Sequence, residues 1–334
     1  MTEGIYILGN DGVYDQVVAL LNSIEVNVGD KYPIFIVPYN EDLELVKKDI
    51  KNRSNVEIFA DSSAMKLWED YSTEIWKAHP EAFKIWQEQG ISGVYRLGMH
   101  RRFGGFNGPF DKFLYLDADI LVLNSLDYIF KQLDTNDFVV YDFQYKDLSH
   151  VYNTKSEKLL DIFPQYRLDT EIFCSGLYAG KKDLFNEETR QNLLSKLQDG
   201  EAEILYQNAP INTILNYLVM RSEVDIYNFA FNLPESEMTG CCITSPHFEE
   251  RDNLVYDKGN CLTYLHYIGL SSKFFKRLCS GENIDFPYRE TFLHYRYLKE
   301  PDKRPKFTTK PVAYNAPPSF STRVLKRLGI KAGA

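Results

Sequence analysis

The sequence predicts an α/β fold whose mixed, mostly parallel sheet is flanked by helices. In the first sixty residues, short apolar runs alternate with stretches of helical periodicity, the order expected of parallel strands joined by crossover helices. The runs are continuously apolar, as in strands covered by helices on both faces. A chain of 334 residues is long enough to bury a large core and still form a ligand-sized cleft.

The individual elements follow from local pattern. Apolar runs predict strands at residues 5–8, 34–37, 56–59, 112–123, 138–143 and 262–268. Helical periodicity predicts helices at residues 14–26, 41–52, 62–89 and 205–220. We expect the third helix to break at His79-Pro80, because proline lacks an N–H and clashes with the preceding turn. A glycine-rich turn at residues 102–109 leads into the fourth strand.

Composition excludes several classes of protein. The formal net charge of -9 and the absence of a basic, aromatic-interleaved face disfavour nucleic-acid binding. The first residues lack the features of a signal peptide, and the longest uncharged stretch, 204–220, is too polar to span a membrane. We therefore expect a cytoplasmic protein. Its aromatic residues are expected to pack in the core.

The five cysteines give no disulfide or zinc pattern. They are scattered without a C-x-x-C spacing, at Cys174, Cys241, Cys242, Cys261 and Cys279. In a chain of this size they are expected to be reduced thiols. The adjacent pair alone offers too few ligands for a structural zinc ion.

The chain is expected to divide into a body, residues 1–298, and a basic, proline-rich tail, residues 299–334. The tail holds nine basic and two acidic side chains, which gives it a net charge of +7. A short helix from Ser319 would place apolar residues against basic ones and could lie on the anionic inner face of a membrane. A disordered, solubilising end is the alternative.

Two carboxylates mark the most informative segment. Asp117 and Asp119 follow the buried run 113–116, so both emerge where a central strand ends. Ligands bind at the carboxyl edge of such sheets. Two acids this close in a dry position repel each other unless a cation lies between them, and a hard divalent ion that holds a diphosphate would supply it. The alternative is that Asp119 caps a turn and Asp117 is solvated.

A second strand end offers an imidazole. The segment from His266 to Gly269 ends the predicted strand 262–268, Gly269 allows close approach of the backbone to a ligand, and Lys273 supplies a positive charge. An ammonium near a diphosphate would neutralise charge on the leaving group. A packed core histidine is the alternative reading of His266.

Four segments together resemble the retaining glycosyltransferases of family eight and their GT-A relatives. The segments are residues 95–97 (Tyr-Arg-Leu), 111–122 (with Asp-Ala-Asp), 173–176 (Phe-Cys-Ser-Gly) and 266–269 (His-Tyr-Ile-Gly). Their order and spacing are more specific than any one of them. The resemblance implies a GT-A fold and a hexosyltransferase that binds a nucleotide-sugar, usually a UDP-sugar, with Mn²⁺ or Mg²⁺. A glycan or lipid-linked acceptor would receive the sugar.

The resemblance also implies roles for individual residues. The metal ligands would be Asp117, Asp119 and His266. The nucleotide-sugar would be bound by Leu8, Asn10, Asp11, Tyr14, Arg96, Asp117, Ala118, Ser175, Gly176, Asn212, Gly269 and Lys273. Groups close to the anomeric carbon would come from Gln207, Asn208 and Arg96.

Several of these residues have simpler alternatives. Asp11 would accept a hydrogen bond from the base and Tyr14 would stack on it, but residues 10–12 also fit a turn and Tyr14 a helix surface. Arg96 would contact the donor sugar, but it also fits a solvated helical charge. The pair Ser175-Gly176 would let the backbone approach the sugar, but it is also common at bends.

The chain departs from the family pattern at three places. Cys174 stands where the family has Asn, and the helix start D-Q-D-x-x-N appears here as residues 207–212, Gln-Asn-Ala-Pro-Ile-Asn. Lys273 follows His266 by one residue more than in the family.

The implied chemistry is departure of a nucleoside diphosphate from the sugar C1, with the metal and Lys273 stabilising the leaving charge. Retention requires no dedicated base, whereas inversion would require one such as Asp169 or Glu171. One alternative is a sugar-1-phosphate nucleotidylyltransferase, whose glycine-rich loop carries an Arg that residues 8–13 lack. Another is a nucleotide-sugar-binding protein without transfer activity.

Overall fold

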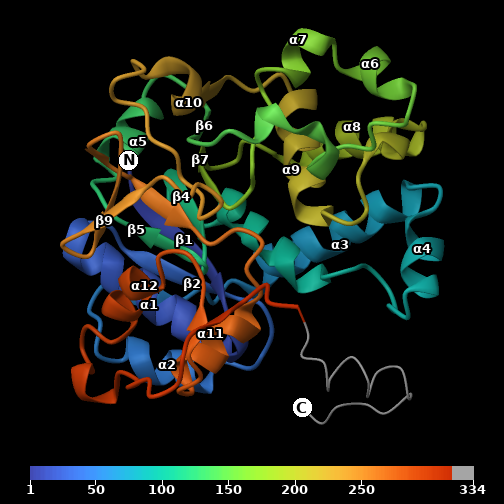
Figure 1. Cartoon of the computed structure of the whole chain (residues 1–334). Helices are drawn as coiled ribbons and strands as arrows, with labels where there is room; N and C mark the ends of the chain where they lie inside the picture. The colour runs from blue at the N-terminus through green and yellow to red at the C-terminus, as the bar shows by residue number, and fades with distance from the viewer. Residues whose placement is uncertain (318–334) are drawn as a thin grey trace.

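The computed structural model describes residues 1–317, and a seven-stranded sheet lies at its centre (Figure 1). The strand order is β3-β2-β1-β4-β7-β6-β8. The strands are β1 (Glu3–Gly9), β2 (Ile34–Pro38), β3 (Val56–Ile58), β4 (Lys112–Asp117), β6 (Phe138–Val140), β7 (Leu177–Lys181) and β8 (Ile226–Asn228). Only β7 runs antiparallel to its neighbours, β4 and β6. The predicted mixed, mostly parallel sheet is confirmed.

The helices flank this sheet. The longer ones are α1 (Tyr14–Asn27), α2 (Glu44–Ile50), α3 (Ser62–Ala78), α4 (Ala82–Glu88), α5 (Asp127–Gln132), α8 (Glu187–Gln198), α9 (Pro210–Arg221), α11 (Ser272–Cys279) and α12 (Arg289–Arg296). The shorter ones are α6 (Lys158–Ile162), α7 (Gln165–Leu168), α10 (Phe229–Asn232) and a 3-10 segment, η2 (Leu97–Asn107). The break predicted at His79-Pro80 separates α3 from α4. The helix predicted from residue 205 begins at Pro210, because proline is accommodated only in the first turn.

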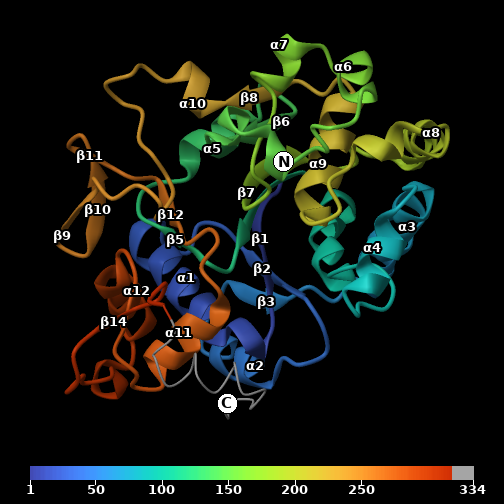
Figure 2. The same ribbon diagram turned by 45° about the vertical axis from the view of Figure 1, so that its right-hand side comes forward.

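The two faces of the sheet bury different side chains. Along β1, Tyr6 contacts one core, whereas Ile5 and Ile7 contact the other, as expected for a period of two. The first core also contains side chains of α3, α8, α9 and η2, and the second those of α1, α2 and α5. Figure 2 shows the sheet between these two groups of helices. Helices on both faces explain why the strands are apolar throughout.

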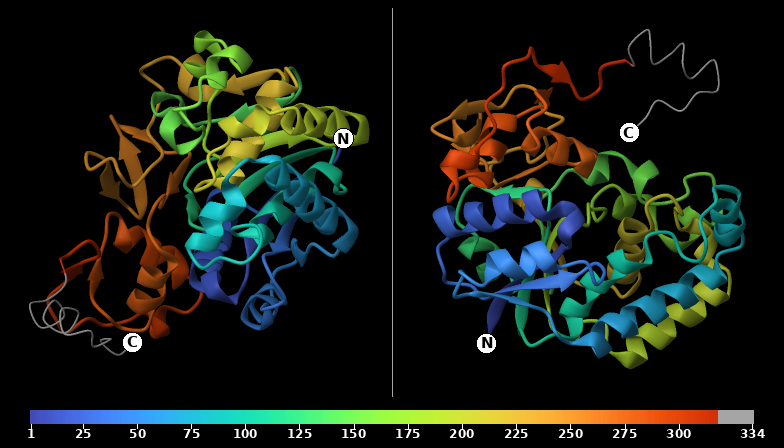
Figure 3. Two further views of the ribbon diagram at one scale, coloured as in Figure 1. Left: turned by 90° about the vertical axis from the view of Figure 1, so that its right-hand side faces the viewer. Right: turned by 90° about the horizontal axis from the view of Figure 1, so that it is seen from below.

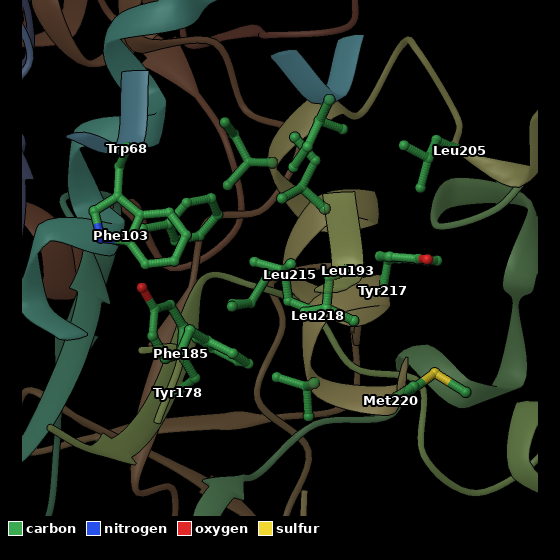
Figure 4. Close-up of a cluster of buried hydrophobic side chains, with 14 of the residues drawn as sticks. Trp68, Phe103, Tyr178, Phe185, Leu193, Leu205, Leu215, Tyr217, Leu218 and Met220 are labelled. Atoms are coloured by element: carbon green, nitrogen blue, oxygen red, sulfur yellow. The ribbon is translucent and has the colours of Figure 1, made fainter. Parts of the chain in front are cut away.

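Aromatic and aliphatic side chains together fill the first core (Figure 4). Trp68, Trp76 and Trp86 are all fully buried, so the expectation that they pack in the core is confirmed. Trp68 packs edge-on against Phe103 and Phe185, with ring centroids 5.4 and 6.3 Å apart. Packing of this kind joins α3 to η2 and to the segment that precedes α8. Helix α8 itself runs beside α3 (Figure 3).

The strand predicted over residues 112–123 is divided by a turn. Its second half, β5 (Ile120–Val122), leaves the main sheet and pairs antiparallel with β12 (Tyr264–His266). Beyond it lies a three-stranded sheet of β9 (Glu249–Arg251), β10 (Leu254–Asp257) and β11 (Asn260–Cys261). The turn at residues 118–119 therefore lies between two sheets.

The predicted division of the chain after residue 298 stays a prediction, and the first residues beyond it contact the body. A strand of the predicted tail, β14 (Val312–Ala313), pairs in parallel with β13 (Ile284–Asp285), and Phe307 packs against the core beneath α11 and α12. The helix predicted from Ser319 lies outside the described residues. Among residues 1–317, no helix is both long enough and apolar enough to cross a membrane.

We predict that Trp68→Phe destabilises the fold by about 1–2 kcal/mol more than Trp76→Phe. Trp68 Nε1 donates to Asn107 Oδ1 at 2.8 Å, whereas the buried Trp76 Nε1 has no partner among residues 1–317. The first substitution therefore loses a hydrogen bond and the second removes an unsatisfied donor. Urea unfolding of both variants measures the difference, and equal losses would contradict the prediction.

Candidate functional site

The three predicted metal ligands converge at the turn between the sheets. Asp117 ends β4, Asp119 lies in the turn before β5, and His266 ends β12, opposite Ile120 of β5. One ligand atom from each side chain lies within 4.8 Å of the other two, and His266 Nε2 is 3.3 Å from Asp119 Oδ1. Among residues 1–317, no other group of three or more His, Cys, Asp or Glu side chains converges in this way.

This donor set fits a divalent cation such as Mn²⁺ or Mg²⁺, because it combines two carboxylates with one imidazole. Burial raises the pKa of Asp117, an effect that Arg102 opposes and the Asp119 carboxylate increases. Burial lowers the pKa of His266, but the Asp119 carboxylate and the Cys174 thiol together outweigh burial and hold this pKa well above its usual value. The cluster thus contains repelling acids that a cation would stabilise.

Arg102, which the sequence analysis did not single out, holds Asp117 in place. Its side chain is 1% exposed, and Nη1 lies 2.9 Å from Asp117 Oδ1. Nη1 also donates to the Ser175 carbonyl at 3.3 Å, and the guanidinium lies over the ring of Tyr115 at 4.6 Å. The Tyr115 hydroxyl donates to the same Asp117 oxygen at 2.7 Å. A charged, buried contact of this kind fixes the orientation of the carboxylate.

The loop before β7 reaches the cluster because β7 is antiparallel to β4. The Asp117 N–H donates to the Gly176 carbonyl at 2.8 Å. A Cβ atom at Gly176 would lie 2.4 Å from His266 Cε1, so this glycine makes room for the imidazole. The sequence analysis had attributed the small Ser175-Gly176 pair to approach of the donor sugar, whereas the described contact is with His266.

Helix α9 positions this loop from behind. Asn212 Oδ1 accepts from the Ser175 N–H at 2.8 Å. Asn216 binds Phe173 twice: its Oδ1 accepts from the N–H at 3.0 Å and its Nδ2 donates to the carbonyl at 2.8 Å. Asn216 was not predicted, although it lies one helical turn after Asn212.

A cavity of about 380 Å³ adjoins the cluster at the carboxyl ends of β1 and β4. Of the predicted binding residues, it is lined by Leu8, Asn10, Arg96, Asp117 and Ala118. Arg96 adopts a left-handed backbone conformation with φ of 54° and lies over the Tyr95 ring. Such a conformation is uncommon for a residue other than glycine and is frequent at functional sites.

Two residues predicted to bind the base do not line this cavity. Both oxygens of Asp11 accept backbone N–H groups at the start of α2, from Leu45 at 2.9 Å and Val46 at 3.0 Å. The Tyr14 ring lies against the Arg296 guanidinium, 5.2 Å away. These contacts occupy both side chains within the protein.

The predicted residues near α11 and α9 also lie outside the lining of this cavity. Gly269 has a φ of 78°, a backbone conformation that favours glycine. Lys273 is exposed on the first turn of α11. The Gln207 carbonyl accepts from Trp86 Nε1 at 3.2 Å, and Asn208 Nδ2 donates to the Tyr206 hydroxyl at 3.2 Å. The neighbours of Gly269 and Lys273, Leu270 and Ser272, do line it.

A larger cavity, of about 770 Å³, reaches the cluster from the side of His266. It contains Asp142, which was not predicted and is 4% exposed. Its Oδ1 accepts from the Gln144 N–H at 2.6 Å and its Oδ2 from the Cys174 N–H at 3.0 Å. Burial raises the pKa of Asp142 to about 7. The sequence signal was an acid within the apolar run 138–143.

Neither acid considered as the base of an inverting enzyme lines either cavity. Glu171 pairs with Arg167 at 2.5 Å. Asp169 is exposed and accepts from Gln165 Nε2 at 2.8 Å. Both acids therefore interact with side chains of α7 and not with either cavity.

We predict that the stability difference between Asp142→Asn and the wild type depends on pH. Because the pKa of about 7 in the folded state exceeds that of an unfolded Asp, about 4, ionisation of Asp142 destabilises the fold. The penalty is absent below about pH 4 and complete above about pH 7. The free energy of unfolding of the variant, relative to wild type, should therefore rise between these values by up to about 4 kcal/mol. Urea unfolding at several pH values tests this, and a constant difference would contradict it.

We predict that Gly176→Ala weakens divalent-cation binding about tenfold or more, because the added methyl group displaces the His266 ring. Titration calorimetry with Mn²⁺ measures the change. Circular dichroism should show an unaltered fold, since Gly176 does not have a positive φ. Unchanged Mn²⁺ affinity in a folded variant would contradict the prediction, because it would show that the His266 ring can shift without weakening cation binding.

Comparison with known proteins places the fold. No family model and no curated protein matches the chain. The WbbM bifunctional glycosyltransferase, in apo form, superposes with a TM-score of 0.51 and 14% identity over 91% of this chain and 52% of WbbM, so the chain spans about half of that protein. The galactosyltransferase LgtC, in complex with donor and acceptor sugar analogs, superposes at 0.48 and 15% identity over 93% and 98%. Mouse xyloside xylosyltransferase 1 superposes at 0.47 and 12% identity over 68% and 85%. The superposition on WbbM confirms the predicted GT-A fold.

Proposed function

We propose that this protein is a metal-dependent glycosyltransferase that moves a sugar from a nucleotide-sugar, a UDP-sugar in the first instance, to a hydroxyl group of an acceptor. One observation carries the proposal. Asp117, Asp119 and His266 converge at the carboxyl end of a central strand, beside a cavity, in a fold similar to that of WbbM. The carboxyl edge of an open α/β sheet is where nucleotides bind, and acidic clusters there hold the cation of a diphosphate.

The smaller cavity would hold the nucleotide. Leu8, near the end of β1, and Asn10, directly after it, would contact the base, while Asp11 would act behind them by holding the start of α2. Arg96 lines the cavity and would contact the sugar or a phosphate oxygen. When bound, Mn²⁺ or Mg²⁺ would neutralise the diphosphate and stabilise it as a leaving group.

The larger cavity would hold the acceptor, a glycan or the sugar of a lipid-linked glycan. It meets the cluster at His266, on the side away from Leu8 and Asn10, and its volume is about 770 Å³. The C1–oxygen bond of the donor would break, and an acceptor hydroxyl would form the new bond. Asp142 lies in this cavity and would orient that hydroxyl.

Retention of the anomeric configuration is the outcome we favour. Neither Asp169 nor Glu171 lines either of the two cavities described above, so neither is placed to act as the base that inversion needs, and both oxygens of Asp142 already accept backbone N–H groups. With retention, the leaving phosphate itself can take the proton of the acceptor. Gln207 and Asn208, which precede α9, would supply the polar group near C1 if the segment between η5 (Glu201–Ile204) and α9 moves inward on binding.

We predict that UDP binds in the presence of Mn²⁺ and that Asp119→Asn weakens this binding at least about tenfold. Titration calorimetry with and without Mn²⁺ measures both. Asp199→Asn is the matched control, because Asp199 is exposed at the end of α8 and lines neither cavity. Release of UDP from UDP-sugars in the presence of candidate acceptors then identifies the substrates.

UDP binding that is independent of Mn²⁺ and equal in the three proteins would contradict a metal-held diphosphate. Binding of GDP in place of UDP would change only the donor. Pyrophosphate formation from a nucleoside triphosphate and a sugar 1-phosphate would identify a nucleotidylyltransferase instead.

A further inference from the structure

Two thiols face each other beside the cation cluster. The sulfur atoms of Cys241 and Cys242 are 3.5 Å apart, and both residues are free cysteines. Both line the larger cavity, together with His266. Cys241 is 4% exposed and Cys242 is half-buried, so a reagent that enters from solvent reaches Cys242 first.

The pair does not complete a metal site within the described residues. A structural zinc ion takes four ligands, and the only convergence of three or more donors among residues 1–317 is that of Asp117, Asp119 and His266. Cys174 lines the same cavity but does not join the two thiols in such a group. Two thiols this close to each other can be joined by oxidation, because a sulfenic acid on one condenses with the other to form a disulfide.

The backbone around the pair holds His266. The His266 N–H donates to the Cys241 carbonyl at 2.7 Å, and the Ile243 N–H donates to the His266 carbonyl at 3.1 Å. Cys242 and His266 are the centre of this short parallel bridge. The peptide unit that links Cys241 to Cys242 therefore carries the acceptor that positions the imidazole-bearing residue.

We propose that a hydroperoxide oxidises Cys241 and Cys242 to a reversible disulfide, and that this disulfide weakens the cation site through His266. The second part rests on the proposed function, because it takes His266 as a cation ligand. The two thiols lose two electrons and two protons, which the peroxide accepts as its O–O bond breaks. A dithiol reductant would return both and restore the thiols.

The reaction proceeds in two balanced steps. The Cys242 sulfur attacks one oxygen of hydrogen peroxide, which forms a sulfenic acid and releases one water. The Cys241 sulfur then attacks the sulfenic sulfur, which forms the S–S bond and releases a second water. Cys242 is the first to react because it is the more exposed of the two.

A disulfide between consecutive cysteines closes a small ring that includes the peptide between them. Its formation has to distort that peptide. The sulfurs must approach from 3.5 Å to about 2.05 Å. The Cα atoms of consecutive residues are about 3.8 Å apart, closer than the roughly 4.4–6.8 Å of ordinary disulfides. The intervening peptide absorbs the difference, and its carbonyl is the one that accepts from His266. Strained disulfides are also readily reduced, which makes the change reversible.

The test treats the full chain with hydrogen peroxide and measures intact mass and Mn²⁺ affinity. We expect a loss of about 2 Da, located to a peptide whose two thiols resist alkylation, and a Mn²⁺ dissociation constant raised about tenfold. Dithiothreitol should reverse both changes. Cys242→Ser should show neither the mass loss nor a peroxide-induced change in its own Mn²⁺ affinity. Cys279→Ser removes a half-buried thiol on α11 and should behave as the wild type.

Three outcomes would overturn the proposal or part of it. A gain of about 32 Da on Cys242, the mass of a sulfinic acid, without a disulfide would show that Cys241 does not resolve the sulfenic acid. A disulfide with unchanged Mn²⁺ affinity would overturn the coupling to His266. Lack of Mn²⁺ binding by the reduced protein would refute the metal role of His266, while the mass measurement would still decide whether the disulfide forms.

Discussion

The buried contact between Arg102 and Asp117 is the interaction on which the site depends. It joins η2, the end of β4 and the loop before β7, because Arg102 also donates to the Ser175 carbonyl. Removing a charged pair from water is unfavourable, and Arg102 Nη2 has no partner among residues 1–317. Stability alone therefore does not explain the pair. Its effect is positional: Arg102 and Tyr115 both hold the same Asp117 oxygen, and the other oxygen would be available to the proposed cation.

The antiparallel strand β7 has a similar organising effect. In a wholly parallel sheet, the beginning of a strand lies far from the carboxyl ends of its neighbours. Since β7 is reversed, the loop that precedes it meets the end of β4, and Gly176 contacts both Asp117 and His266. Helix α9 then holds this loop through Asn212 and Asn216. The single reversed strand explains how residues far apart in the chain share one site.

Local pattern was sufficient to predict most of the fold and the core of the site. Apolar runs predicted the strands, and His79-Pro80 predicted the break between two helices. The position of Asp117 and Asp119 directly after a buried strand predicted that they belong to a ligand site. Contacts between distant segments could not be predicted. Nothing local distinguishes Arg102, which binds Asp117, from Arg101, which forms a half-buried pair with Glu69. Likewise, Asp142 matters because tertiary folding buries it, and β5 left the main sheet because β12, over a hundred residues later, pairs with it.

The pairing of β5 with β12 also has a consequence for biosynthesis. The central sheet is complete once β8 has left the ribosome, because all seven strands lie before residue 229. His266 is made later, so a nascent chain can form its sheet and the first core while the candidate cation site still lacks its third ligand. A cation proposed to bind there could gain this third ligand only after residue 266 has left the ribosome. A nascent chain that ends before His266 would thus contain all seven strands of the central sheet but only two of the three converging side chains.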